Sequence, residues 1–300
     1  MRLLRRKVAL GSPAVRRGAW LGLVVAACLA AGCSPLLLLN GTDGDRPLRA
    51  QRDIAYGPLH RQRLDIYALE SAASNRPVIV FFYGGAWQRG ERWKYRFVGE
   101  ALAADGAVAV VPDYRVYPEA RFPDFVRDGA RAVAWVRENI GRFGGDPSRI
   151  YLMGHSAGAH IAALLALDAR YLQGEGLSPR DLRGFIGLAG PYDFLPLRSE
   201  RLKDVFEDTG DPGRLAATQP INFASPQAPP SLLLTGASDG VVRPSNTQRL
   251  AERLHAAGAV VTEKVYPDLG HPGIILALST ALRHLAPVRE DIAHFIAAEK

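Results

Sequence analysis

Short apolar runs alternate with amphipathic stretches along most of the chain. The runs "VIVFF" and "VAVV" are unbroken and rich in β-branched residues, which is typical of central strands buried on both faces of a parallel sheet. Together with helical periodicity between the runs, this alternation predicts an α/β fold with a mostly parallel sheet. The eight expected strands span residues 53–56, 64–68, 77–83, 107–112, 149–153, 184–188, 231–235 and 260–266.

Helices are expected between and after these strands. The last of them should break near Pro287, because proline interrupts a helix. A segment rich in Pro, Arg and Asp, residues 190–230, separates the sixth and seventh strands and predicts a short lid. The expected helices span residues 95–104, 125–143, 157–168, 244–257 and 274–298.

The net charge of +7 is concentrated at the N-terminus. Six of the 37 Lys and Arg residues precede residue 33, where there is no Asp or Glu, so the rest of the chain is almost neutral. No later run of like charge is long enough to suggest a groove for nucleic acid, and we expect no nucleic-acid partner. The near-neutral domain also predicts no strong electrostatic selection of substrates.

The same N-terminal segment has the pattern of an export signal. A basic start precedes the apolar stretch "AWLGLVVAACLAA", which is too short to span a membrane as a helix of about 20 residues. The following "AAGC" resembles the lipobox of bacterial lipoproteins, although Ala30 departs from it; an ordinary secretory signal is the alternative. We therefore predict a signal peptide (1–32), lipidation at Cys33, a flexible tether (33–50) and a catalytic domain (51–300). The protein should be an exported, lipid-anchored protein of the cell envelope.

The sequence "GHSAG" lies where a predicted strand gives way to a predicted helix. Ser156 there is flanked at two residues' distance by Gly154 and Gly158, which is the pattern of a nucleophile elbow. Such a turn exposes the serine hydroxyl at the start of a helix, where developing negative charge is favoured. The alternative is a glycine-rich turn with an ordinary capping serine.

A serine nucleophile needs a histidine to take its proton and a carboxylate to orient that histidine. His271 is the best candidate, because it follows the last strand in a turn bounded by Gly and Pro. Asp239, after the seventh strand, is the favoured acid; Asp193 and Asp268 are its rivals. The other histidines beyond residue 240 lie in predicted helices: His255, His284 and His294.

The loop "GGAW" after the third strand is a candidate oxyanion hole. Its glycines would expose the amides of Gly85 and Ala86, and the amide of Ala157 would be a third donor. A plain Gly-Gly turn is the alternative. Trp87 in this loop is a candidate substrate contact.

Taken together, these motifs resemble the α/β-hydrolase superfamily over residues 53–295. Within it, the chain is similar to hormone-sensitive-lipase-like esterases and to the related bacterial acetyl or feruloyl esterases and kynurenine formamidases. The matching segments are "YGGAW", "PDYRVYPEARFP" and "FGGDPSRIYLMGHSAGAH". The resemblance implies that Ser156, Asp239 and His271 form a catalytic triad. One departure is Tyr83, which stands where most of these proteins have histidine.

The expected activity is that of a serine hydrolase that cleaves carboxylic esters of small molecules, with a short acyl chain, through an acyl-enzyme. It should need no metal and no organic cofactor. An amidase of the arylformamidase type would use the same residues and is one alternative. A ligand-binding protein that shares the fold without catalysis is another. The oligomeric state stays open.

Overall fold

The chain divides into two compact units, residues 1–39 and 40–300, and every element named below belongs to the second. The predicted signal peptide (1–32) and the predicted lipidation site at Cys33 lie outside the described residues. Within the part of the chain that is described, no helix is both long and apolar enough to cross a membrane. The computed structural model describes residues 39–40, 47–70, 74–207 and 209–298.

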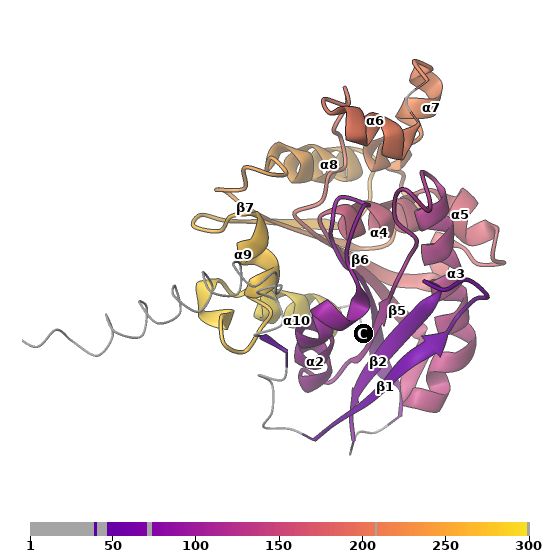
Figure 1. Ribbon diagram of the computed structural model, residues 1–300. Coiled ribbons are helices and arrows are strands. Elements are labelled where there is room, and N and C mark those ends of the chain that lie inside the picture. Colours follow the sequence, from indigo (N-terminus) through magenta and orange to yellow (C-terminus); the bar gives the residue numbers. More distant parts are fainter. Residues whose placement is uncertain (1–38, 41–46, 71–73, 208, 299–300) are drawn as a thin grey trace, which may run out of the picture. The chain divides into compact units, whose positions relative to one another are not determined.

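Eight strands form one sheet, in the order β1-β2-β4-β3-β5-β6-β7-β8 (Figure 1). β2 runs antiparallel to both of its neighbours, and all the other neighbours run parallel. The prediction of an eight-stranded, mostly parallel sheet is therefore confirmed. The strands are β1 (Leu48–Ala55), β2 (Arg63–Leu69), β3 (Arg76–Phe82), β4 (Val108–Pro112), β5 (Gly145–His155), β6 (Leu182–Leu188), β7 (Ser231–Gly236) and β8 (Val261–Tyr266).

The unbroken apolar runs form the centre of this sheet. Val80 of β3 pairs with Val110 of β4 on one side and with Leu152 of β5 on the other, and all three side chains are buried. Burial on both faces explains why these strands show no alternation of polar and apolar residues.

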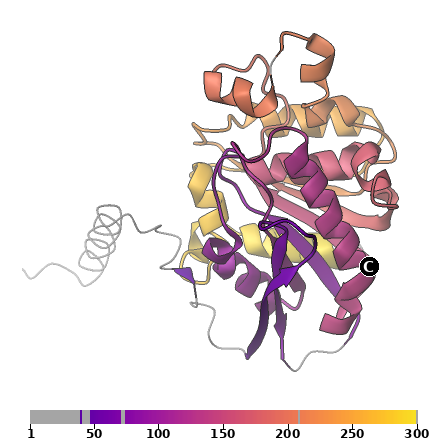
Figure 2. The ribbon, with the colours of Figure 1, turned by 45° about the vertical axis from the view of Figure 1, so that its right-hand side comes forward.

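Helices cover both faces of the sheet, with α3 and α4 on one side and α2 and α10 on the other (Figures 1 and 2). Gly129 of α3 lies close to α4 and to the ring of Phe82. On the opposite face, Phe295 of α10 contacts the ring of Tyr151. The longer helices are α2 (Arg96–Ala104), α3 (Asp124–Asn139), α4 (Ala157–Leu167), α8 (Ser245–Ala256) and α10 (Val288–Ala298).

The connection between β6 and β7, predicted to be a lid, contains α6 (Glu200–Phe206), α7 (Pro212–Ala216) and η5 (Pro220–Phe223). In both ribbon views α6 and α7 lie at the top, apart from the sheet (Figures 1 and 2). Several contacts join the connection to the rest of the domain, two of them through aromatic or imidazole rings near the cavity. The ring of Phe206 meets that of Trp87, with centroids 4.8 Å apart, and His160 Nε2 donates to the carbonyl of Thr218 at 2.8 Å. Its movement as a lid stays a prediction.

Several element boundaries differ from those predicted, most clearly at β1, at β5 and in the C-terminal helical region. β1 begins at Leu48, inside the range 33–50 predicted to be a tether, because it is an edge strand whose side chains are mostly exposed and carry no hydrophobic signal. β5 begins with the polar residues "GDPSR", and the first of them, Gly145, pairs with Arg76 of β3. The C-terminal helical region is divided into α9 (His271–Leu276), a 3₁₀ turn at Arg283–Leu285, and α10, a wider break than predicted.

Candidate active site

Ser156 is the single residue between β5 and α4. Its backbone angles, φ 56° and ψ −125°, are strained for any residue other than glycine and reverse the chain abruptly. Backbone atoms pack closely against residues 154 and 158, on either side of Ser156, so both residues must be small. A Cβ atom on Gly158 would lie 2.0 Å from the carbonyl oxygen of Phe82, and one on Gly154 would lie 2.2 Å from that of Gly158. The local structure is thus the nucleophile elbow that the sequence predicted.

Ser156, His271 and Asp239 form a continuous chain of hydrogen bonds. His271 Nδ1 lies 2.7 Å from Asp239 Oδ2, and His271 Nε2 lies 2.9 Å from Ser156 Oγ. Because the carboxylate can only accept, Nδ1 carries the imidazole proton and Nε2 is free to accept from the serine hydroxyl. The three residues follow β5, β7 and β8, so they meet at the carboxyl edge of the parallel strands.

Asp239 is held as a carboxylate. Its side chain is fully buried, which raises the pKa of the carboxyl, but the hydrogen bonds from His271 and from two backbone amides together lower that pKa below its usual value. The amides of Val241 and Val242 donate to its other oxygen, at 2.9 and 2.8 Å, and stabilise the charge further. Asp239 can therefore orient the histidine and stabilise an imidazolium.

The rival residues lie elsewhere. Asp193 forms an ion pair with Arg249, with Oδ2 and Nε 2.9 Å apart, and Asp268 is exposed. The remaining candidate histidines are all exposed: His255, His284 and His294.

His155, which sequence reasoning did not select, supports the hydrogen-bonded chain from Asp239 to Ser156 by contacting His271. Its Nε2 lies 3.1 Å from the backbone oxygen of His271, and the two rings are tilted by 37° with centroids 4.8 Å apart. Burial lowers the pKa of His155 to about 3, so the ring stays neutral beside the catalytic candidate. Its position next to Ser156 in "GHSAG" was the only signal in the sequence.

The loop after β3 passes directly beside the serine, since a Cβ on Gly84 would lie 3.0 Å from that of Ser156. Among the described residues, no hydrogen-bond acceptor meets the amides of Gly85, Ala86 or Ala157. Ala86 has a φ of 54°, a conformation that turns the backbone sharply at this point. The three predicted donors thus have no acceptor within the described part of the chain.

Tyr83 anchors this loop from within the core. Its hydroxyl donates to Asp113 Oδ1 at 2.7 Å and accepts from Arg61 Nη2 at 3.0 Å. The same guanidinium donates to the carbonyl of Gly90 at 2.6 Å, at the far end of the loop, and the hydroxyl of Tyr114 donates to the Tyr83 carbonyl. A largely buried network centred on the Tyr83 hydroxyl and carbonyl therefore holds both ends of the loop.

A cavity of about 440 Å³ opens beside Ser156 and Ala157. Trp87, the predicted substrate contact, lies in its wall but is almost completely buried, and its ring packs on Phe194 and Phe206. Its indole Nε1 is buried without a hydrogen-bond partner among the described residues. The other apolar lining residues include Phe194, Leu195, Leu202 and Val241.

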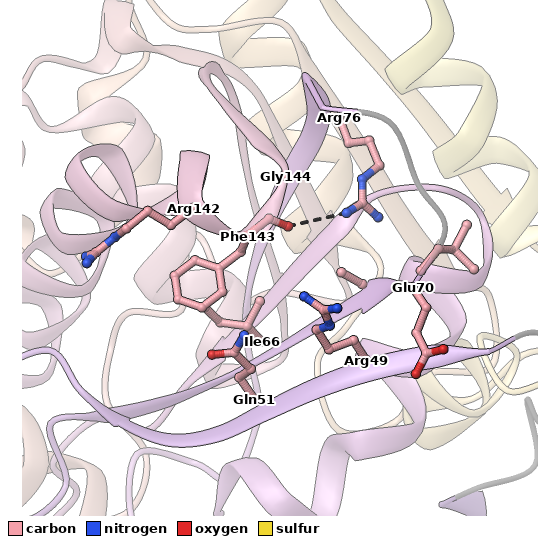
Figure 3. A pocket seen from close by; sticks show the side chains of 10 residues that line it. Arg49, Gln51, Ile66, Glu70, Arg76, Arg142, Phe143 and Gly144 are labelled. Atoms are coloured by element: carbon pink, nitrogen blue, oxygen red, sulfur yellow. Dashed lines mark hydrogen bonds between the residues drawn. The ribbon is translucent and has the colours of Figure 1, made fainter.

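A second, smaller cavity of about 150 Å³ lies between β1, β2 and the turn before β5 (Figure 3). Arg76 donates there to the carbonyl of Phe143, and none of the lining residues belongs to the cavity at Ser156. The described residues contain no group of His, Cys, Asp and Glu that could hold a metal ion.

Solved structures share this fold. A truncated carbohydrate esterase from gut microbiota superposes with a TM-score of 0.74 at 20% identity, covering 85% of this chain and 98% of its own. An esterase from Pseudomonas putida ECU1011 gives a TM-score of 0.70 at 23% identity, covering 93% of this chain and 97% of its own. These likenesses confirm the α/β-hydrolase fold.

Curated relatives are similar in sequence over most of the chain. The isoprenylcysteine alpha-carbonyl methylesterase ICME of Arabidopsis thaliana is 33% identical over 247 residues, which are 76% of this chain and 58% of the relative. Esterase LipQ of Mycobacterium tuberculosis (strain ATCC 25618 / H37Rv) is 32% identical over 256 residues, 80% of this chain and 61% of the relative. The chain thus spans about three fifths of the length of these relatives.

The family model BD-FAE matches residues 64–254, a range that contains the predicted oxyanion loop, the elbow and Asp239. His271 lies beyond the matched range, but the structure brings it to Ser156 within hydrogen-bond distance. By sequence and by fold, the chain belongs to the BD-FAE family of the α/β-hydrolase superfamily.

Proposed function

We propose that this protein is a serine carboxylesterase that hydrolyses small esters through an acyl-enzyme. The observation that carries the proposal is the unbroken relay from Asp239 through His271 to the strained Ser156, beside three unoccupied backbone donors. A histidine-activated serine at such a site is the arrangement that acyl transfer requires. The relatives that are named esterases support the same conclusion.

In acylation, Ser156 Oγ attacks the ester carbonyl while His271 Nε2 takes the hydroxyl proton. The carbonyl oxygen becomes an oxyanion that the amides of Gly85, Ala86 and Ala157 stabilise. His271 then gives the proton to the leaving alkoxide, which departs as the alcohol and leaves the acyl group on Ser156.

Deacylation repeats these steps with water as the nucleophile. His271 takes a proton from water, the hydroxide attacks the acyl carbonyl, and the same amides stabilise the second oxyanion. Return of the proton to Ser156 Oγ releases the carboxylic acid. Asp239 stays ionised throughout, because it stabilises the imidazolium that forms in both halves of the reaction.

The cavity supports a short acyl chain. Its volume of about 440 Å³ is near the lower end of the 300–1,000 Å³ or so that ligand pockets usually occupy. It must also hold the alcohol portion of the substrate, which leaves little room for a long chain.

The test compares the wild type with Ser156→Ala on p-nitrophenyl acetate, on longer p-nitrophenyl esters and on N-formylkynurenine. We expect turnover of the acetyl ester to exceed that of the long-chain esters, and we expect Ser156→Ala to lose both turnover and labelling by a fluorophosphonate probe. Labelling that survives in Ser156→Ala would contradict the role of this serine. Faster turnover of N-formylkynurenine than of every ester would instead favour the amidase.

We also propose, on the N-terminal sequence alone, that the protein is exported and lipidated at Cys33. The basic start, the short apolar stretch and "AAGC" support this. Expression of the full chain in a bacterium fed with labelled palmitate should label the wild type and leave Cys33→Ser unlabelled. Equal labelling of both proteins would contradict it.

A further inference from the structure

The cavity beside Ser156 has a positive rim. Arg198 lies just before α6, in the β6–β7 connection, and Arg243 lies just before α8, in the loop that carries Asp239. Both side chains are exposed and line the cavity. The two arginines therefore line the same cavity as Ser156 but come from separate segments of the chain.

Among the described residues, no carboxylate lies within ion-pair distance of Arg198 or Arg243. Of the described residues that line the cavity, Asp193 alone is acidic, and Arg249 already engages it. Asp239, which is not among the lining residues, accepts hydrogen bonds from His271 and two amides.

The positive surface continues past the oxyanion loop. Ala86 also lines a neighbouring pocket, whose charged residues are Arg89 and Arg201 and whose lining contains no acidic residue. Like charges gathered around a cleft with apolar walls focus a positive potential at its mouth. Because the net charge of the domain is almost zero, its composition does not reveal this local excess of positive charge.

From this arrangement we infer that the preferred substrates are esters that also carry a free carboxylate. The inference rests on the proposed esterase function and specifies its substrate class. A guanidinium offers a planar set of donors that matches a carboxylate, and charge-assisted hydrogen bonds are stronger than neutral ones. The apolar side chains of Leu195, Leu202 and Val241 would hold the hydrocarbon part, while Arg198 and Arg243 bind the anion.

The experiment uses two pairs of substrates that differ only in one charge. In the first pair, 4-acetoxybenzoate and its methyl ester, the charge lies on the alcohol half. In the second pair, mono-(4-nitrophenyl) adipate and its methyl ester, the charge lies on the acyl half. For each pair, kcat/KM of the anionic ester is divided by that of the neutral ester, in the wild type, in the double variant Arg198→Gln/Arg243→Gln, and in Arg253→Gln.

Arg253 is the matched control, because it is an exposed arginine of α8 that does not line the cavity. Comparing ratios between proteins cancels the different intrinsic reactivities of the esters. We expect the double variant to lower the ratio about tenfold in at least one pair, as the loss of charge-assisted bonds predicts, and Arg253→Gln to leave it unchanged. In the wild type the ratio should fall as salt is added.

A ratio that stays within threefold of the wild-type value in both pairs, or that falls equally in Arg253→Gln, would overturn the inference. This outcome is separable from failure of the proposed function. If the neutral esters are hydrolysed by the wild type and not by Ser156→Ala, the esterase function stands whatever the ratio. If no ester is hydrolysed, the proposed function fails first.

Discussion

The imidazole of His155 is bonded to the backbone of His271 rather than to its side chain. His155 Nε2 donates to the His271 carbonyl at 3.1 Å, while the His271 ring faces Ser156 on one side and Asp239 on the other. His271 is the first residue of α9, a helix of six residues. Without the contact from His155, this short helix alone would hold the His271 carbonyl in place. The contact therefore fixes the backbone of His271, the residue that carries the predicted catalytic imidazole.

Replacing His155 should lower kcat through misplacement of His271. We expect His155→Ala to reduce kcat by about 100-fold with little change in KM, since displacement of a reacting group by about 1 Å can cost that much. His155→Gln, whose amide can donate where Nε2 does, should recover most of the loss. Steady-state kinetics on p-nitrophenyl acetate would measure both, and equal losses in the two variants would contradict a positioning role.

The carboxylate of Asp239 should be needed for its charge and not only for its shape. Asp239→Asn should lower kcat by about 10⁴-fold, because an amide in this position favours the wrong imidazole tautomer. The exposed Asp268→Asn, close to His271 in sequence, is the control and should keep kcat within a few-fold of the wild type. Loss of activity in Asp268→Asn with retention in Asp239→Asn would reverse the assignment.

The elbow should not tolerate a methyl group at residue 158. Gly158→Ala would place a Cβ 2.0 Å from the Phe82 carbonyl, so the helix and the strand must move apart. We expect a loss of about 1–3 kcal/mol in the free energy of unfolding, as for overpacking of a rigid core. Gly141→Ala, where no atom lies within 4 Å of the new Cβ, should lose less than about 1 kcal/mol. Urea unfolding followed by circular dichroism would show whether the two variants differ.

The buried His160 should make the protein less stable in acid. Burial lowers its pKa from the ordinary 6.5 to about 4, so the unfolded chain binds the proton first as the pH falls. The associated stability is complete above about pH 6.5 and is lost towards pH 4, at up to about 1.4 kcal/mol per pH unit.

His160→Gln should weaken this pH dependence, because glutamine can still donate to the Thr218 carbonyl but cannot gain a proton. The free energy of unfolding of both proteins, measured between pH 7 and pH 4 by urea titration, would test this. The same slope in both would show that His160 does not contribute.

The sequence was informative where a feature depends on local pattern. The runs around Val80 and Val110 located the central strands because burial on two faces excludes polar residues. Ser156, Asp239 and His271 were selected because each follows a strand, and parallel strands end at a common edge. The structure does bring these three side chains together; their catalytic roles stay predictions.

Features that depend on contacts between distant segments could not be predicted. The polar start of β5 is a strand only because it pairs with Arg76, which no local pattern shows. The role of His155 depends on where the backbone of residue 271 passes. The charge at the rim depends on the approach of Arg198 and Arg243 from two separate loops, and the balanced composition of the domain gives no sign of it.

The position of Ser156 is set by the backbone of the elbow, and Arg243 shares its loop with Asp239, whereas Arg198 projects from the β6–β7 connection, outside the sheet. Under the proposals above, that connection supplies one of the two substrate-binding arginines and none of the reacting groups. Grafting other sequences into the β6–β7 connection offers a route to enzymes with new ester preferences, since the reacting groups would keep their scaffold.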